Sequence, residues 1–584
     1  MEPIPLVARS LSGRAWRLRA ADERAALALA QRHGLPEIVG RLLALRAVGL
    51  DEAPFFLEPK LRDWLVDPSH LLDLDRAAAR LADAVEAGEA VGLIGDYDVD
   101  GATSTALARR HLEALGLAVH AEIPDRLKDG YGPNRGAFDR LREQGCRLVL
   151  TLDSGTTAFE PLAYAQSQGQ EVVVVDHHGA EAGLPGAYAV VNPNRRDQRS
   201  PLGHLAAVGV TFLLLVGLNR ELRRRGRFAS RPEPDLKASL DLVALGTVCD
   251  VVPLLGLNRA FVVQGMKVAA GGGNPGIQAL AAVAGLAKLD EARQLGFALG
   301  PRINAGGRMG ESRLGLDLLA APDEATAAPV ARRLDALNRE RQEVEGDCLQ
   351  RARREAERQA GLGMSVLVVG DEGWHPGVLG IVASRLVEAF ERPALVVGKG
   401  GKGSGRSVPG FDLGGAVIAA RQAGLLIHGG GHPMAAGFTL DAERKDAFQA
   451  ALQAALAASP VGGEAMPLVV DGELSAGSAT VELCRKLERL APFGSGNDEP
   501  LFALGNARVV QARAVGKGHV SLVLQAPNGR SLKAIAFRAR ERGLEGPLLH
   551  ADAPLRLAGH LRLDTWNGRT RPALHVRDAA IDGG

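Results

Sequence analysis

Apolar runs with the length of buried strands alternate with helical patterns between residues 76 and 200. The runs are rich in Val, Leu, Ile and Ala and occupy residues 90–94, 118–123, 147–152, 171–175 and 187–191. Helical periods over residues 103–115, 135–144 and 159–168 separate the first four runs. This regular alternation predicts an α/β domain in which helices cover both faces of a parallel sheet.

Acidic residues follow four of these strands. The acids are Asp96, Asp98 and Asp100 after the first strand, Asp125 after the second, Asp153 after the third and Asp176 after the fourth. Turn chemistry accounts for one or two of them, because Asp is common in turns. Ligands of parallel sheets bind beyond the carboxyl ends of the strands, so we expect these acids to share a site.

The first strand end reads Gly-Asp-Tyr-Asp-Val-Asp-Gly over residues 95–101. In extended backbone, side chains at alternate positions point the same way, so the three carboxylates are expected to converge. Grouped carboxylates resist ionisation, and a bound hard cation such as Mg²⁺ or Mn²⁺ relieves their repulsion. A calcium loop of the EF-hand type does not fit, because position 107 is Leu instead of Glu. An exposed acidic turn is the alternative interpretation.

Imidazoles and one more acid extend this set. His177 and His178 directly follow Asp176. In extended backbone their side chains diverge, so one can bind a metal while the other faces substrate or an acid. Asp250 follows an apolar helical run at residues 236–248, where the helix dipole gives an acid no benefit. Asp250 is therefore either a metal ligand or part of an ordinary helix-exit turn.

Composition limits the remaining possibilities. A length of 584 residues predicts roughly three to five domains, and a net charge of +1 argues against a globally basic nucleic-acid binder. The aromatic content of 4% disfavours a long base-stacking platform. The four cysteines are isolated, which argues against zinc or disulfide frameworks and fits a cytoplasmic protein. The uncharged apolar run at 205–218 is shorter than the ~20 residues that span a bilayer, so we expect no membrane segment.

Several motifs together resemble the DHH phosphoesterase superfamily, and within it the RecJ family of bacterial single-strand-specific DNA exonucleases. The motifs are GDYDVDGATS with Asp98 and Asp100, IPDR and DGYG at 123–126 and 129–132, Asp153-Ser154-Gly155, Asp176-His177-His178 and GGGHPMAAG at 429–437. The resemblance covers the chain from about residue 76 onward. It implies a metal-dependent exonuclease that degrades single-stranded DNA 5′ to 3′ to mononucleotides in recombination and DNA repair.

The resemblance and the changes of pattern imply a domain plan. The fold class expected is α/β, with two α/β domains joined by a long helix around a cleft, plus a C-terminal OB-like β-barrel. The expected domains are an N-terminal helical appendage (1–75), a DHH catalytic domain (76–322), a connector helix (323–360), a DHH-associated substrate-binding domain (361–460) and an OB-like nucleic-acid-binding domain (461–584).

The resemblance also implies two divalent cations, Mn²⁺ or Mg²⁺. The implied ligands are Asp98, Asp100, Asp153, His177 and Asp250, with Asp153 favoured as the bridging ligand. Asp96 would be an additional ligand or a supporting acid. His178 would hydrogen-bond the scissile phosphate or orient a ligand. Because carboxylates outnumber imidazoles, the set favours Mn²⁺ or Mg²⁺ over zinc.

The substrate-binding residues implied by the resemblance come from separate segments. Arg126 would contact phosphate, and Tyr131 would stack on a base. Two arginines in a glycine-rich turn at 300–308, and two glycine-rich loops at 403–407 and 429–437, would face the DNA backbone. The residues expected there are Arg302, Arg308 (slightly favoured), Ser404, Arg406, Gly430, Gly431 and His432.

The implied partners are single-stranded DNA, a single-strand-binding protein and a RecQ-type helicase, and a monomer is expected. Two other functions compete with this one. The first is a DHH-type phosphohydrolase of short or cyclic nucleotides, which would need neither the barrel nor the long connector. The second is a non-catalytic DNA-binding scaffold, which is disfavoured because the chain keeps all the acids.

Overall fold

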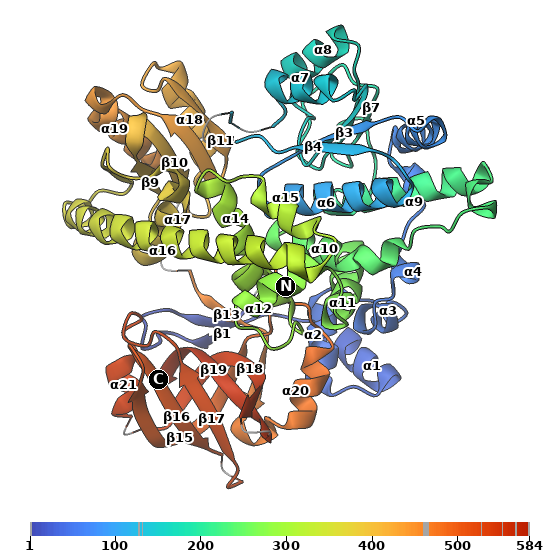
Figure 1. Cartoon of the computed structure of the whole chain (residues 1–584). Coiled ribbons are helices and arrows are strands. Elements are labelled where there is room, and N and C mark those ends of the chain that lie inside the picture. Colours follow the sequence, from blue (N-terminus) through green and yellow to red (C-terminus); the bar gives the residue numbers. More distant parts are fainter. Residues whose placement is uncertain are drawn as a thin grey trace. The chain divides into compact units, whose positions relative to one another are not determined.

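The structure is a computed structural model, and it describes residues 3–125, 129–130, 132–459, 466–526, 528–551, 553–566 and 569–581 (Figure 1). The chain divides into two compact units. The larger unit contains residues 66–250 and 265–463, and the smaller unit contains residues 1–65, 251–264 and 464–584. Among the described helices, none is both long enough and apolar enough to cross a membrane.

A five-stranded parallel sheet with the order β4-β3-β5-β6-β7 forms the first half of the larger unit. Its strands are β3 (Val91–Gly95), β4 (Val119–Glu122), β5 (Leu148–Leu152), β6 (Glu171–Val175) and β7 (Ala189–Val191). Every residue of β3 and β5 is buried, as expected for central strands covered on both faces. The predicted parallel α/β sheet is confirmed.

Helices cover both faces of this sheet (Figure 1). On one face, α7 (Arg135–Glu143) and α8 (Phe159–Ser167) pack through Phe138 and Leu162 against Val149 and Val174. On the other face lie α5 (Leu74–Ala87), α6 (Val99–Ala114) and α9 (Ala207–Arg224), followed by α10 (Leu240–Cys249) against α6. The apolar run expected to form a buried helix is the start of α9.

A long helix, α16 (Glu324–Gly361), leads to a second sheet, as predicted. The strand order is β11-β12-β10-β9-β8, with β8 (Leu367–Gly370), β9 (Ala394–Val397), β10 (Lys402–Arg406), β11 (His428–His432) and β12 (Ala435–Thr439). Helices α16 and α17 (Leu379–Phe390) pack on one face, and α18 (Leu413–Gln422) and α19 (Lys445–Ala457) pack on the other. Shorter helices complete the unit: α12 (Pro275–Val283), α13 (Ala292–Gln294), α14 (Gly300–Arg308) and α15 (Leu314–Leu319).

The glycine-rich stretches expected to be loops or turns are regular elements instead. Residues 403–406 lie in β10, and β11 pairs with β12 across the second glycine string. A Cβ at Gly403 would come within 2.3 Å of the Phe438 ring, and one at Gly431 within 2.3 Å of the Ala435 carbonyl oxygen. Residues 300–308 form helix α14, where a Cβ at Gly307 would lie 3.1 Å from the Tyr97 ring. These glycines therefore permit close packing inside strands and a helix.

The smaller unit contains a β-barrel. Its strands follow the order β14-β15-β16-β17-β19-β18, and pairing of β15 with β18 closes the sheet. The strands are β14 (Gly472–Ser475), β15 (Phe502–Val515), β16 (His519–Gln525), β17 (Ser531–Ala536), β18 (Leu555–Trp566) and β19 (Arg569–Ile581), with helices α20 (Val481–Glu488) and α21 (Glu545–Leu549). This arrangement confirms the predicted C-terminal OB-like barrel.

The N-terminal residues belong to the same unit as the barrel. Strands β1 (Ile4–Val7) and β2 (Trp16–Leu18) form a sheet with β13 (Leu468–Val470), and α1 (Glu23–His33), α2 (Glu37–Leu45), α3 (Ala53–Leu57) and α4 (Leu61–Trp64) follow. Helix α11 (Gly256–Ala270) starts in this unit. Leu42 and Phe56 share one apolar core with Leu487 and Phe502. The segment expected to be wholly helical therefore also contains two strands.

This shared core predicts that the N-terminal helices need the barrel. A fragment of residues 1–463 should aggregate or bind a hydrophobic dye, because it leaves the apolar faces of α1 to α3 exposed to water. A fragment of residues 66–463 is the control, since it lacks those helices as well as the barrel. Solubility and dye fluorescence of the two fragments test the prediction, and equal solubility would contradict it.

Candidate metal centre

The structure brings the acids and histidines predicted as metal ligands to the carboxyl edge of the first sheet. Asp96 follows β3, Asp98 is the N-cap of α6, Asp100 lies in the first turn of α6, Asp153 follows β5, His177 and His178 follow β6, and Asp250 caps the C-terminus of α10. Their ligand atoms form three groups, each within 4.8 Å. The groups are Asp96, Asp98 and Asp153; Asp100, His177 and Asp250; and Asp153, His177 and His178.

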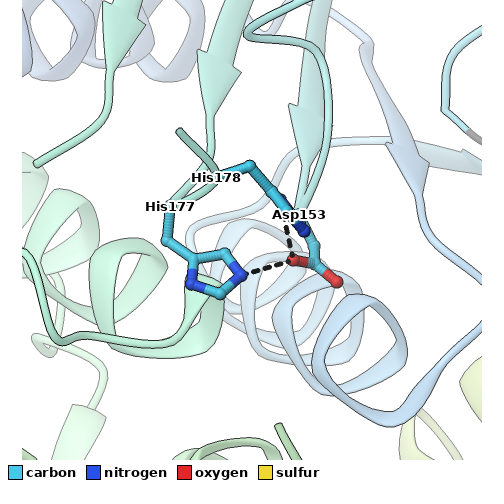
Figure 2. Close-up of side chains that lie close together, drawn as sticks. All are labelled: Asp153, His177 and His178. Carbon is cyan, nitrogen blue, oxygen red and sulfur yellow. Dashed lines mark ion pairs between the residues drawn. The ribbon is translucent and has the colours of Figure 1, made fainter. Parts of the chain in front are cut away.

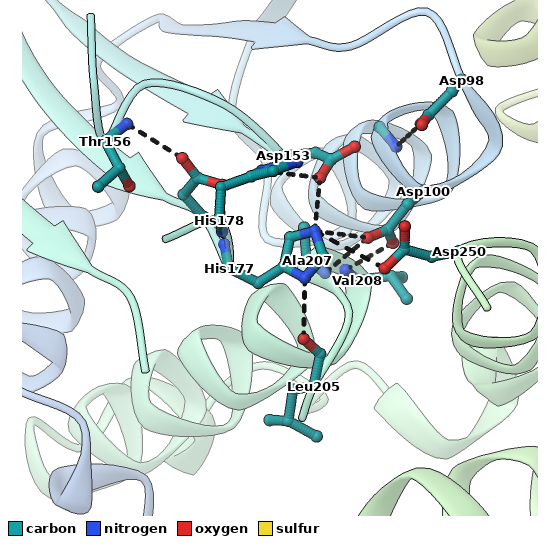
Figure 3. A network of polar contacts seen from close by, with 12 residues as sticks. Asp98, Asp100, Asp153, Thr156, His177, His178, Leu205, Ala207, Val208 and Asp250 are labelled. Carbon is teal, nitrogen blue, oxygen red and sulfur yellow. Dashed lines mark hydrogen bonds and ion pairs between the residues drawn. The ribbon is translucent and has the colours of Figure 1, made fainter. Parts of the chain in front are cut away.

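The three aspartates after β3 do not share one extended segment, contrary to the prediction. The chain enters α6 at Val99, and Asp98 Oδ1 accepts the Gly101 N–H at 2.9 Å as a helix cap. Asp100 instead accepts the backbone N–H groups of Ala207 (2.6 Å) and Val208 (2.9 Å) at the start of α9 (Figure 3). The turn therefore divides the acids between two ligand groups, with Asp96 and Asp98 in one and Asp100 in the other.

Asp153 connects these groups. It belongs to the group with Asp96 and Asp98, and its Oδ1 lies 3.3 Å from Nε2 of His177, which belongs to the group with Asp100. The residue is buried and has a φ of 63°, a left-handed conformation that is uncommon for residues other than glycine. Such conformations occur preferentially at functional sites. Asp125, after β4, is in none of the three groups among the described residues.

The two histidines face the same carboxylate. Figure 2 shows both rings directed at Asp153, with His178 Nδ1 3.9 Å from Asp153 Oδ1. The ring centroids are 4.5 Å apart. The rings do not diverge, contrary to the prediction, but His178 Nδ1 does face an acid, since it lies 2.8 Å from Asp176 Oδ1. Asp176 Oδ1 also accepts the backbone N–H groups of His177 (2.8 Å) and His178 (3.1 Å). This turn ends the extended conformation immediately after β6.

The environment of His177 suits a metal ligand. Its Nδ1 lies 3.1 Å from the Leu205 carbonyl oxygen, so Nδ1 carries the proton and the lone pair of Nε2 faces the acids (Figure 3). Nε2 is 3.7 Å from Asp250 Oδ2 and 3.9 Å from Asp100 Oδ2. Both Nε2 of His177 and Oδ2 of Asp250 are buried and have no hydrogen-bond partner among the described residues. A cation bound between them would satisfy both atoms, so this donor set fits a divalent metal ion.

Burial and mutual repulsion change the pKa values of the acids. Burial raises the pKa of Asp100 and Asp153 well above the ordinary value, and neighbouring carboxylates raise both further. Burial, together with the charge of Asp98, raises the pKa of Asp250 to about 7. These shifts are the expected cost of gathering carboxylates without a counter-ion, and a bound cation would reverse them.

The two histidines are shifted in opposite directions. Burial lowers the pKa of His177 to about 4, so its imidazole is neutral at physiological pH. Burial also opposes the charged form of His178, but the hydrogen bond from Nδ1 to Asp176 Oδ1 at 2.8 Å outweighs it and raises the pKa to about 9. His178 is therefore a cation beside Asp176, whose own pKa lies well below its usual range despite burial.

Comparisons with known proteins match three regions of the chain. Models of the "DHH family, N-terminal domain", the "DHHA1 domain" and the "RecJ OB domain" match residues 90–247, 363–458 and 470–578. The single-stranded-DNA-specific exonuclease RecJ of Escherichia coli (strain K12) is 37% identical over 522 residues, which cover 86% of this chain and 89% of that protein. The chain belongs to the RecJ family.

Further RecJ relatives agree with this assignment. RecJ of Bacillus subtilis (strain 168) is 34% identical over 581 residues, covering 97% of this chain and 71% of that protein. The crystal structure of RecJ in complex with Mn²⁺ from Thermus thermophilus superposes with a TM-score of 0.80 at 32% identity, covering 97% of this chain and 80% of that one. A Mg²⁺ complex of RecJ from the same organism also matches, with a TM-score of 0.74.

The predicted substrate-binding residues of this RecJ-family chain lie on several elements. Arg126 and Tyr131 fall outside the described residues. In α14, Arg302 Nε pairs with Asp335 of α16 at 2.9 Å, whereas Arg308 donates to the Gly377 carbonyl oxygen at 3.0 Å. The remaining residues are on two strands of the second sheet that lie on either side of β12: Ser404 and Arg406 in β10, and Gly430, Gly431 and His432 in β11. Their contact with DNA stays a prediction.

Among the polar residues that support the histidines, sequence reasoning placed Asp176 at the site but missed Asn192 and Asn194. Asp176 binds both histidine N–H groups, and its Oδ2 accepts the Thr156 N–H at 3.0 Å. Asn192 and Asn194 donate to the carbonyl oxygens of His178 and His177. A signal for the asparagines exists in the sequence, because they follow the fifth strand as the acids follow the first four. Applying the strand-end rule to all five strands would have identified them.

Proposed function

We propose that this chain is a metal-dependent exonuclease that degrades single-stranded DNA. The observation that carries the proposal is Asp153, which is shared by ligand groups on both sides of it at the edge of a parallel sheet. The relatives that match most of this chain are named single-stranded-DNA-specific exonucleases. The matched OB domain favours a polynucleotide over the short or cyclic nucleotides of the alternative phosphohydrolase.

The residues that would hold the cations are those of the two linked groups. Asp96, Asp98 and Asp153 would hold one ion, and Asp100, His177 and Asp250 the other, with Asp153 between them. Divalent cations bound in this way supply Lewis acidity toward a phosphodiester and lower the pKa of water. The carboxylate-rich set suits Mn²⁺ or Mg²⁺.

Other side chains of the site would bind and orient the substrate. The His178 side chain is 45% exposed and its Nδ1 is held by Asp176 Oδ1 at 2.8 Å, which leaves Nε2 to contact a phosphate oxygen of the DNA when the ring is protonated. His177 is held by the Leu205 carbonyl and stays neutral, which keeps its Nε2 available as a ligand. Hydrolysis of this kind needs no nucleophilic side chain, because water attacks the phosphorus directly.

Finer features of the function belong to the same proposal. Degradation would run 5′ to 3′ and release mononucleotides during recombination and DNA repair. The backbone of the DNA strand would contact Arg126, Arg302 or (slightly favoured) Arg308, Ser404, Arg406, Gly430, Gly431 and His432, and Tyr131 would stack on a base. The protein would act as a cytoplasmic monomer together with a single-strand-binding protein and a RecQ-type helicase.

The test is hydrolysis of end-labelled single-stranded DNA with and without Mn²⁺. From a 5′-labelled strand we expect labelled mononucleotide at the earliest times, and from a 3′-labelled strand a gradually shortening series. A duplex of the same sequence and a dinucleotide are the comparison substrates, and both should be degraded more slowly. Faster hydrolysis of the dinucleotide would favour the small-substrate phosphohydrolase, and early mononucleotide from the 3′ label would reverse the direction.

A further inference from the structure

The segment Asn192-Pro193-Asn194 follows β7 at the sheet edge that carries the metal ligands. Asn192 is completely buried. Its Nδ2 donates to the hydroxyl oxygen of Thr156 at 2.8 Å and to the carbonyl oxygen of His178 at 2.9 Å. The Asn192 side chain also makes a third contact, because its Oδ1 accepts the Asn194 N–H at 2.7 Å.

Asn194 makes the equivalent contact to His177, the residue before His178. Its Nδ2 donates to the carbonyl oxygen of His177 at 2.5 Å and to that of Gly203 at 3.1 Å. The carbonyl groups of two successive histidines are therefore each held by a different asparagine, while Asp176 holds both of their N–H groups. Fixing both sides of a dipeptide fixes its φ and ψ angles, and these set the directions of the two imidazoles.

We propose that Asn192 and Asn194, here called the asparagine clamp, are positioning residues for the metal centre. This inference rests on the proposed function, because it assumes that the histidines serve bound cations. Outer partners that orient metal ligands affect metal affinity although they never touch the ion. The clamp reaches the ligands through backbone carbonyls and not through the imidazole rings.

The two asparagine side chains contact different parts of the site. Asn194 holds the carbonyl of His177, which belongs to the group with Asp100 and Asp250. Asn192 also binds Thr156, whose N–H donates to Asp176 Oδ2 at 3.0 Å and which lies in the same loop as Asp153. Asn192 thus links the loop after β5 to the loop after β6. A change at Asn192 should disturb both cation sites, whereas a change at Asn194 should disturb one.

An ordinary asparagine turn does not account for these contacts. Such a turn requires the bond between the Asn194 N–H and Asn192 Oδ1 and nothing more. The bonds donated by the two Nδ2 groups go to other segments, namely the β5 loop, the histidine pair and Gly203. Losing a donor here leaves a carbonyl oxygen without its partner, and the peptide can then rotate.

The experiment measures Mn²⁺ binding to the full chain by titration calorimetry, alongside hydrolysis of single-stranded DNA. For Asn194→Ala we expect about tenfold weaker binding at one of two sites, and for Asn192→Ser a similar loss at both. The kcat should fall while the KM for DNA stays at the wild-type value. The isosteric Asn194→Asp should resemble Asn194→Ala, because it keeps the shape and removes the donor.

Asn274→Ala is the matched control. Asn274 is buried in the same unit, and its Nδ2 donates to the Leu319 carbonyl oxygen at 2.8 Å, away from the histidines. This variant should lower the Tm without changing Mn²⁺ affinity.

Wild-type Mn²⁺ affinity in both Asn194 variants would overturn the clamp, and so would a raised KM for DNA with unchanged Mn²⁺ affinity. Failure of the wild-type chain to cleave DNA would count against the proposed function, and calorimetry would still decide the clamp.

Discussion

Replacing Asp153 with asparagine is expected to lower single-stranded DNA hydrolysis by roughly 10³-fold or more, which corresponds to about 4 kcal/mol of transition-state stabilisation. Asp153 belongs to two of the three ligand groups, and its Oδ1 lies 3.3 Å from Nε2 of His177 in the third, so one substitution removes a donor from two groups and alters the surroundings of the third. Asparagine keeps the shape and removes the charge that a pair of cations requires. Initial rates at saturating Mn²⁺ measure the effect.

The fold should tolerate this substitution. Burial and neighbouring carboxylates raise the pKa of Asp153, which means that its charge is unfavourable in the metal-free protein. Asp153→Asn should therefore unfold at the same temperature as the metal-free wild type or at a higher one. Asp241→Asn is the control, because Asp241 is an equally buried acid that accepts the N–H groups of Leu242 and Asn274 outside the metal centre. Near-normal hydrolysis by Asp153→Asn would contradict the two-cation arrangement.

Chelation of divalent cations is expected to abolish activity, and the stabilisation gained on adding Mn²⁺ should grow with pH. In the metal-free protein the pKa of Asp250 is about 7, and those of Asp100 and Asp153 are also raised above their unfolded values. Acids of this kind contribute stability below their unfolded pKa, and that contribution is lost as the pH rises through the folded pKa. For Asp250 the metal-free protein should therefore lose stability as the pH rises from about 4 to about 7, and the raised pKa values of Asp100 and Asp153 add further loss in the same direction.

The stabilisation by Mn²⁺ increases with pH, because the cation binds the charged forms of these carboxylates. Below pH 7 it must displace a proton from Asp250, so its half-saturating concentration should rise up to about tenfold per pH unit for each proton displaced. His177, with a pKa of about 4, stays neutral over this range and adds no pH dependence. Thermal unfolding at pH 6 and pH 8.5, each with EDTA or excess Mn²⁺, measures the effect. An equal Tm gain at both pH values would disprove it.

Much of the site could be predicted because its residues follow local patterns. The apolar runs specify strands, the helical periods between them specify parallel crossovers, and the carboxyl ends of parallel strands meet at one edge. Asp96, Asp153 and His177 meet there for that reason. The conformation between residues 96 and 100 could not be read in this way. The same sequence is compatible with an extended segment and with a helix start, and in the structure Asp98 caps the start of helix α6.

Contacts distant in sequence were the part that local patterns missed. Asp100 is held by amides at the start of α9, and the proton of His177 is placed by the Leu205 carbonyl. The glycine-rich sequences of β10 and β11 were predicted to be loops. The sequence does not reveal that Phe438 and Ala435 approach these glycines closely. The same limit hides the core that Leu42 and Phe502 share in the smaller unit.

The sequence alone determined which strands form the first sheet and which acids and histidines stand at its edge, since both depend on periodicity along the chain. Only the tertiary structure decided how those ligands divide into three groups, two of which contain Asp153, and which backbone groups and asparagines hold them. The physical reason is that hydrogen bonds and packing between distant segments fix the direction of each side chain. Those contacts exist only after the chain has folded.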